Sequence, residues 1–168
     1  YITLRHYPLL LRDTKYIDIT TAPLTKYSIG RSNSKLFVIY AEPAKPEFII
    51  KLDATFQKSI LHRTKAILAV SNSNSTQLYN LKTKSLIHNL EGETFHQFSS
   101  CLRFLVTRDS LNYKFYYLGN GNHVYTLNQQ SRFTISSNES YIAQKLGSNL
   151  SINDITTRQR LWSTTRQD

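Results

Sequence analysis

The sequence predicts an all-β fold built from one antiparallel unit that recurs about five times, and three observations carry this prediction. Short apolar or alternating runs occur in pairs around polar turns along the chain. Eleven Tyr and eight Phe outnumber five Gly and four Pro, and aromatic side chains suit a pleated, half-buried sheet. No stretch of about eleven residues carries an apolar stripe with the helical period of about 3.6 residues.

Each pair of runs predicts a hairpin, because two short apolar or alternating segments flank a turn-rich gap. The gaps are rich in Ser, Asn, Pro and charged residues, which favour turns. The five pairs span residues 8–11 and 16–20, 36–40 and 48–52, 66–70 and 77–81, 103–106 and 113–118, and 141–143 and 150–155.

Shorter runs complete a four-stranded unit, whose strands we name a, b, c and d. A run precedes three hairpins, at 27–29, 59–61 and 133–135, and another follows the second strand of each pair, as at 84–87 and 124–127. Four-stranded antiparallel units recurring every roughly 27 to 38 residues predict the blades of a β-propeller. We therefore expect a single propeller segment over residues 1–168, with about five blades or partial blades. A two-sheet sandwich is the open alternative.

Two of the units resemble the blades of WD-repeat proteins. The third unit ends its strand c in Leu78-Tyr79-Asn80-Leu81, and the fifth ends its strand c in Ile152-Asn153-Asp154-Ile155. Both follow the family's order of an apolar strand, a polar turn, and a second apolar strand that ends in Asn or Asp before an apolar residue. The sequence has no Trp-Asp or Gly-His pair, so the family's Asp–His blade contact is not carried over. The resemblance implies a divergent WD-repeat-like propeller.

A second segment resembles the opening of a forkhead-associated domain, a β-sandwich that binds phosphothreonine peptides. The similar segments are Tyr27-Ser28-Ile29-Gly30-Arg31-Ser32 and His62-Arg63-Thr64-Lys65-Ala66. His stands where that family has Ser, Lys stands where it has His, and its Asn-Gly pair is absent near Ser85-Leu86. This resemblance implies, as the alternative function, phosphopeptide binding through Arg31.

The cysteine content and the chain ends set expectations for the cellular context. The chain begins with Tyr1 and has no Met, so we expect a segment of a longer protein. Cys101 is the single cysteine, which excludes an internal disulfide and favours an intracellular location, nuclear or cytoplasmic. We expect its thiol to be buried and inert. With no apolar run of about 18 residues and no signal peptide, we expect no membrane partner.

Catalytic signatures are missing from the sequence. The five histidines show no i, i+4 pair suited to zinc, and no Gly-x-Ser-x-Gly elbow, P-loop or Gly-x-Gly-x-x-Gly turn occurs. The Gly-rich segment 119–122 lies between two strand runs and predicts a hairpin turn. We therefore expect a protein without enzyme activity, metal, cofactor or small-molecule substrate.

The net charge of +10 and the pI near 9.8 favour an anionic partner. In an antiparallel blade the a–b and c–d turns lie at one end and the b–c turns lie at the other. Our hypothesis is a scaffold or adaptor that joins protein subunits of a larger complex, with one basic end that contacts RNA, DNA or an acidic protein segment. Basic residues at the predicted a–b and c–d turns form this end: Arg31, Lys35, His62, Arg63, Lys65, Lys82, Lys84, Arg158 and Arg160.

Overall fold

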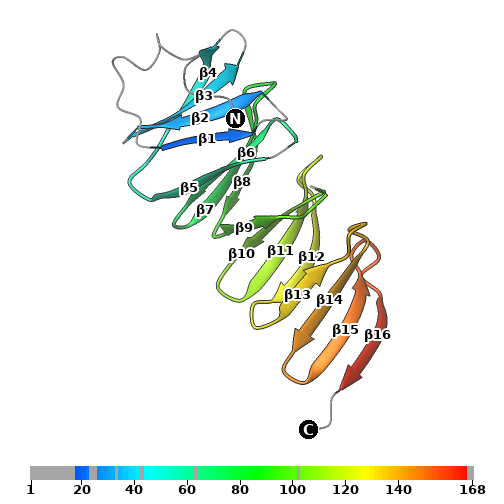
Figure 1. Cartoon of the computed structure of the whole chain (residues 1–168). Helices are drawn as coiled ribbons and strands as arrows, with labels where there is room; N and C mark the ends of the chain where they lie inside the picture. Colours follow the sequence, from blue (N-terminus) through cyan, green and yellow to red (C-terminus); the bar gives the residue numbers. More distant parts are fainter. Residues whose placement is uncertain are drawn as a thin grey trace. The chain divides into compact units, whose positions relative to one another are not determined.

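The computed structural model confirms the all-β, propeller-type fold (Figure 1). It describes residues 18–22, 26–32, 34–41, 44–62, 64–101 and 103–165. These residues form four four-stranded antiparallel sheets, in each of which the strands lie side by side in chain order. We refer to the sheets as the first to fourth blades. The expected hairpin strand at residues 8–11 lies outside the described residues.

The strands of the first two blades include most of the predicted runs. The first blade contains β1 (Asp18–Ala22), β2 (Tyr27–Arg31), β3 (Lys35–Ala41) and β4 (Ala44–Lys51). The second blade contains β5 (Phe56–Leu61), β6 (Ile67–Asn72), β7 (Ser75–Asn80) and β8 (Ser85–Glu91).

The third and fourth blades follow without a helix between them in the described chain. The third blade contains β9 (Thr94–Phe98), β10 (Phe104–Arg108), β11 (Asn112–Tyr117) and β12 (His123–Asn128). The fourth contains β13 (Arg132–Ile135), β14 (Tyr141–Leu146), β15 (Asn149–Asp154) and β16 (Arg160–Thr165). The described part of the chain contains no helix with the length and apolar character that a membrane crossing needs.

The chain divides into two compact units, at residues 1–89 and 90–168. The division falls within β8, so the first unit holds the first two blades up to that strand and the second unit holds the third and fourth. Each unit is described by itself below.

The first blade corrects the predicted order of its strands. The run at 16–20 was expected to pair backward with 8–11, but β1 pairs with β2 in the register Asp18↔Arg31 to Ala22↔Tyr27. Strand β1 is therefore strand a, and β2 and β3 are strands b and c. The turn that carries Arg31 and Lys35 joins β2 to β3 and is a b–c turn, whereas the sequence predicted an a–b turn. A strand run of this length can pair with either neighbour, and local sequence does not choose between them.

The second, third and fourth blades repeat with a period of 37 residues in their turn hydrogen bonds. One bond of 2.9 to 3.0 Å closes each a–b turn, donated by the N–H groups of His62, Ser99 and Ser136 to the carbonyl oxygens of Ile67, Phe104 and Tyr141. Another bond of 2.8 to 2.9 Å joins the c–d turn to the a–b turn, from Leu81, Leu118 and Ile155 to Ala66, Arg103 and Ser140. The repeat that the apolar pattern predicts is therefore also present in the backbone hydrogen bonds of the turns.

The core of the first unit lies between its two blades. Ile29 and Val38 of the first blade pack in one cluster with Leu68, Val70 and Leu81 of the second, and none of the five is more than 2% exposed. Side chains of this kind each contribute about 1.5–3 kcal/mol when they are removed from water. Their packing fixes where the turns of these two blades meet.

The core of the second unit has the same construction. Phe104, Val106 and Phe115 of the third blade pack with Ile142 and Ile155 of the fourth, and all five are fully buried. In both units the blade that comes earlier in the chain presents an apolar face, and the following blade covers it.

Candidate anion-binding groove

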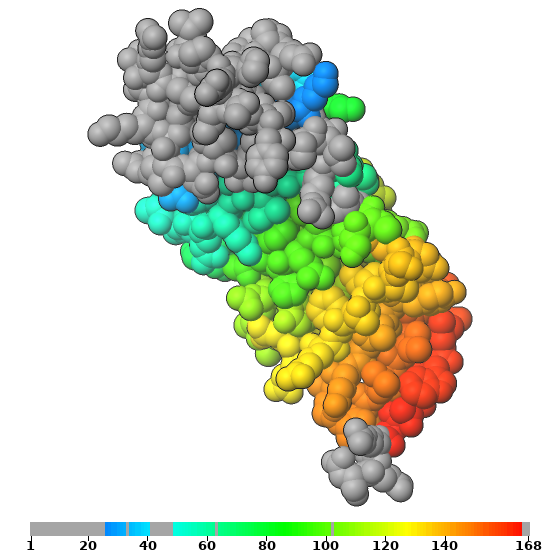
Figure 2. Space-filling model, in the orientation of Figure 1, coloured from blue at the N-terminus to red at the C-terminus, as the bar shows by residue number. Residues whose placement is uncertain are grey.

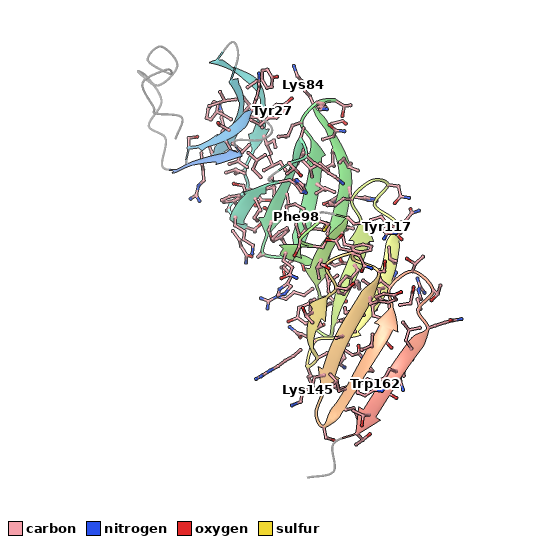
Figure 3. The ribbon with its side chains drawn as sticks, turned by 45° about the vertical axis from the view of Figure 1, so that its right-hand side comes forward. Tyr27, Lys84, Phe98, Tyr117, Lys145 and Trp162 are labelled. Carbon is pink, nitrogen blue, oxygen red and sulfur yellow. The ribbon has the colours of Figure 1, made fainter. Side chains whose placement is uncertain are left out.

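A groove of about 480 Å³ opens at the a–b and c–d turn end of the first unit. It lies where the β1–β2 turn, the β5–β6 turn and the β7–β8 turn meet. Figure 3 labels Tyr27 next to the first of these turns and Lys84 on the last. The groove is lined by seven described residues: Lys26, Thr64, Lys65, Ala66, Ile67, Asn80 and Lys82.

His62 holds the β5–β6 turn in shape. Its Nδ1 accepts hydrogen bonds from the backbone N–H groups of Thr64 at 3.2 Å and Lys65 at 2.8 Å. The side chain is 1% exposed, and burial, with the Lys65 charge as a smaller cause, lowers its pKa to about 4. His62 is therefore neutral at pH 7 and positions Lys65 without adding positive charge to the groove.

Asn80 holds the β7–β8 turn in a similar way. Its Oδ1 accepts hydrogen bonds from the N–H groups of Lys82 at 2.9 Å and Thr83 at 3.2 Å, which is the local turn that Asn and Asp side chains favour. Lys84 then takes a left-handed backbone conformation with φ of 57°. The side chain of Asn80 thus supports the turn whose Lys82 lines the groove.

Backbone and side-chain contacts join the three turns to one another. The Leu81 N–H donates to the Ala66 carbonyl oxygen at 2.8 Å, which connects the β7–β8 turn to the β5–β6 turn. The hydroxyl of buried Tyr27 donates to the Leu81 carbonyl oxygen at 3.4 Å, which connects the first blade to the second. The lysines that border the groove are therefore carried on a connected framework.

The groove combines exposed positive charge with an apolar surface. Lys26, Lys65 and Lys82 are exposed, and none of the seven described lining residues is acidic. Ala66 and Ile67 supply apolar area beside the amines. An anion about 4 Å from one ammonium group gains about 1 kcal/mol in bulk water and about 4 kcal/mol at a partly shielded surface, so three amines around one groove favour a ligand with several negative charges.

The structure brings together only part of the predicted basic end. His62, Lys65, Lys82 and Lys84 lie on the two turns at the groove, while Arg63 lies outside the described residues. Sequence reasoning missed Lys26, although the Thr21-Ala22-Pro23 segment before it carries a turn signal. Lys26 was missed because the strand before it was paired with the wrong neighbour.

Arg31 and Lys35 lie at the other end of the first blade. They flank the b–c turn that the Ser32 N–H closes onto the Lys35 carbonyl oxygen at 2.9 Å. The Arg31 guanidinium stacks over the Phe56 ring, with its central carbon 4.9 Å from the ring centre. The strands form four separate four-stranded sheets, and Arg31 packs on an aromatic ring. This arrangement contradicts the alternative of a forkhead-associated β-sandwich.

Arg158 and Arg160 lie in the second unit. As predicted, Arg158 lies in the turn between strands c and d of the fourth blade, whereas Arg160 is the first residue of β16 and belongs to strand d. The Arg158 Nε donates to the Val124 carbonyl oxygen at 2.8 Å, so this side chain joins the c–d turn of the fourth blade to the third blade. Neither arginine lines the groove.

Cys101 is exposed, which corrects the expectation of a buried thiol. Its Sγ donates to the Ser137 carbonyl oxygen at 2.9 Å. The backbone N–H groups of Cys101 and Arg103 both donate to the carboxylate of Glu139, which is 1% exposed. Because these backbone contacts hold the turn at the surface, Cys101 lies outside the apolar core.

A second polar cluster lies within the third blade. The carboxylate of buried Glu93 accepts hydrogen bonds from the hydroxyl of Thr107, from Lys114 Nζ at 2.8 Å and from the Tyr116 hydroxyl at 2.7 Å. Burial and the hydrogen bond to Glu93 raise the pKa of Tyr116 above its ordinary value. These three contacts join Glu93 to strands β10 and β11 of the same blade, so the cluster stabilises neighbouring strands.

The described residues contain no group of three or more His, Cys, Asp or Glu side chains that could hold a metal ion. No family model matches the chain, and no curated protein matches it.

The solved structures that are similar to this chain include a hydrazine synthase and a heme d1 dehydrogenase. Hydrazine synthase of Kuenenia stuttgartiensis matches with a TM-score of 0.54 and 16% identity, over 96% of this chain and 53% of that one. The dihydro-heme d1 dehydrogenase NirN, in complex with DHE, matches with a TM-score of 0.60 and 11% identity, over 91% of this chain and 38% of that one. The chain thus spans about half, or less, of these proteins, and at these identities the likeness shows the fold alone.

These matches correct the expectation of a non-enzymatic scaffold. That expectation rested on the propeller fold and on missing catalytic motifs, but both structures are named as enzymes. One fold carries many activities, so the fold gives no ground for excluding catalysis.

Proposed function

We propose that this chain is a segment of a longer β-propeller protein and binds single-stranded RNA or DNA through the groove at Lys26, Lys65 and Lys82. The observation that carries the proposal is the meeting of three exposed lysines from three turns of two blades around one groove. A phosphate backbone presents repeated negative charges that such a set of amines can contact together. The net charge of +10 adds a long-range attraction for the same ligand.

The blade class and the longer parent protein belong to the same proposal. Asn80 and Asp154 stand at the ends of the c strands that resemble WD repeats, and each accepts two backbone N–H groups of the following turn. These contacts support a divergent WD-repeat-like class. The two similar structures, of which this chain spans 53% and 38%, support a segment of a longer propeller.

The proposal is tested by fluorescence anisotropy with a fluorescein-labelled oligo(U) and an oligo(dT) of equal length. The triple variant K26E/K65E/K82E removes the groove amines, and we expect its affinity to fall at least tenfold at low salt. Each phosphate contact on a single strand contributes about 0.7 to the slope of log K against log salt. Loss of three contacts therefore lowers that slope by about 2.

The matched control is K35E/K51E/K58E, which changes the net charge by the same amount. These three lysines are exposed on strands of the first unit and do not line the groove. We expect the control to weaken binding only through the reduced long-range field. Equal losses in both variants would show that net charge alone attracts the strand. If polyglutamate displaces the oligonucleotide at equal charge concentration, an acidic protein segment becomes the better ligand.

A further inference from the structure

The side chains that line the groove are almost all hydrogen-bond donors. Figure 2 shows blue surface of the first blade and green surface of the second next to each other at the edge of this unit, where the turns that form the groove meet. The three groove lysines carry ammonium groups, which donate and cannot accept. The side-chain oxygen of Asn80 accepts the N–H groups of Lys82 and Thr83, which uses both of its lone pairs and leaves the NH2 group to donate. Among the described lining residues, the Thr64 hydroxyl is then the one side-chain group that can still accept a hydrogen bond.

Backbone oxygens of the β5–β6 turn are also occupied within the blade. The Lys65 carbonyl oxygen accepts the Ile67 N–H at 2.7 Å, and the Ile67 carbonyl oxygen accepts the His62 N–H at 2.9 Å. The Ala66 carbonyl oxygen accepts the Leu81 N–H at 2.8 Å. A ligand group that accepts hydrogen bonds therefore meets many partners in the groove, whereas a ligand group that donates them meets few and is destabilised when it is buried unpaired.

The described lining of the groove offers no surface on which a nucleobase could stack. Proteins that hold a single strand by its bases place aromatic rings against them, and none of the seven described lining residues is aromatic. Tyr27 and Tyr79 directly adjoin lining residues in the sequence, but both pack in or against the apolar core of the first unit. The Tyr27 ring lies 5.1 Å from the ring of Tyr40, and its side chain is 9% exposed. These rings therefore belong to the core.

A phosphodiester linkage fits this surface better than a base does. The charged phosphate oxygens accept hydrogen bonds, donate none, and are attracted by the three ammonium groups. Every nucleobase, by contrast, carries at least one N–H donor on its pairing edge. Ala66 and Ile67 provide apolar surface beside the amines, which suits the carbon atoms of the sugar ring.

We propose that the groove holds the sugar–phosphate backbone of a single strand and leaves its bases outside. This inference rests on the proposed function and adds which part of the strand the groove contacts. Lys26, Lys65 and Lys82 hold the phosphate oxygens, with the NH2 group of Asn80 as a neutral donor beside them. Because phosphate contacts carry no sequence information, strands of different base sequence bind the groove with similar affinity.

The first test compares oligo(dT) with an abasic strand of equal length, in which every thymidine is replaced by a tetrahydrofuran unit on the same phosphodiester backbone. Thymine bases stack weakly with one another in solution, so their removal changes the free strand little. We expect the two fluorescein-labelled strands to have dissociation constants within about twofold of each other in fluorescence anisotropy at low salt. One base stacked on the protein would favour oligo(dT) by roughly fivefold or more, and that result would overturn the inference.

The groove variant K26E/K65E/K82E separates a failure of this inference from a failure of the proposed function. We expect it to lose about tenfold or more in affinity for both strands. If it binds oligo(dT) as tightly as the wild type does, the proposed function is wrong and the inference falls with it. If it loses affinity for oligo(dT), but the wild type binds the abasic strand much more weakly than oligo(dT), the groove contacts bases and the inference alone is wrong.

Asn80 supplies a second variant, which changes the donor surface and keeps the turn. N80D retains the oxygen that accepts two backbone N–H groups, and Asp154 holds the equivalent c–d turn of the fourth blade in this way. Because the substitution replaces the NH2 donors by a charged acceptor, we expect both strands to bind about fivefold more weakly. The control N74D adds the same charge at an exposed position between β6 and β7, at the other end of the blade. Equal affinities of N80D and N74D would contradict a phosphate contact at Asn80.

Discussion

At the scale of single residues, buried polar side chains set the shapes of the turns that carry the exposed charges. His62 accepts two backbone N–H groups at the groove, and Glu139 accepts two in the second unit. Both side chains are 1% exposed. Removal of such an acceptor leaves two partly buried backbone donors without this partner, which destabilises the turn.

His62 predicts an acid-sensitive first unit. The unfolded chain protonates this histidine below its ordinary pKa of 6.5, but the folded chain does so only below about 4. Unfolding therefore takes up a proton between these values, and stability falls as the pH is lowered from 6.5 to 4, by up to about 3 kcal/mol. We expect H62Q to be less stable at pH 7 but to show a flatter dependence in urea unfolding. H88Q is the control, and an unchanged pH profile in H62Q would contradict the assignment.

Glu139 predicts a large loss of stability on truncation. E139A removes the carboxylate that accepts charge-assisted hydrogen bonds from the N–H groups of Cys101 and Arg103. We expect the free energy of unfolding, measured in urea, to fall by about 2–4 kcal/mol. E139Q keeps one acceptor oxygen and should lose clearly less. If both variants unfold like the wild type, the carboxylate does not hold the two turns together.

At the scale of elements, the c–d turns share one backbone conformation, although different residues adopt it. Lys84, Gly121 and Arg158 lie 37 residues apart and have φ of 57°, 70° and 62°. A side chain in this left-handed region costs roughly 1–2 kcal/mol relative to glycine. The first and third of these turns are supported by Asn80 and Asp154, and backbone contacts of Asp154 with Thr156 and Thr157 lower the pKa of that carboxyl.

This geometry predicts that glycine stabilises two of the turns. K84A and R158A remove the side chain but keep the backbone strain, so they are the reference variants. We expect K84G and R158G each to have a free energy of unfolding roughly 0.5–1 kcal/mol higher than the corresponding alanine variant. G121A should destabilise the third blade by a similar amount. A loss of stability in K84G relative to K84A would mean that the turn does not keep its positive φ in solution.

At the scale of the whole molecule, the described chain consists of two compact units with the same internal construction. Leu81 and Ile155 hold equivalent places in them, and both are fully buried. Truncation of such a core side chain to alanine costs about 2–5 kcal/mol. The two units therefore provide matched positions at which their stabilities can be compared.

We expect the two units to unfold in separable steps. In differential scanning calorimetry, L81A should lower one transition and I155A should lower the other. A single transition shifted equally by both variants would show one cooperative unit in place of two.

Much of the fold could be predicted from the sequence because strand patterns and turn residues act locally. Paired apolar runs around polar turns identified strands b and c in the second, third and fourth blades, and Gly119 to Asn122 identified a c–d turn. The recurrence of these signals determined the all-β class and the four-stranded blade. Two lysines of the groove, Lys65 and Lys82, followed from the same turn assignments.

Only the tertiary structure decided which strands share a sheet, because a strand run can pair with either neighbour and the choice depends on contacts distant in sequence. Pairing of β1 with β2 placed Lys26 in the groove and moved Arg31 and Lys35 to the opposite end of the blade. The folded structure also buries His62, whose ring accepts backbone N–H groups of its own turn. The amino-acid sequence thus determined the repeated unit, and packing between units determined which of its charges and apolar side chains are exposed.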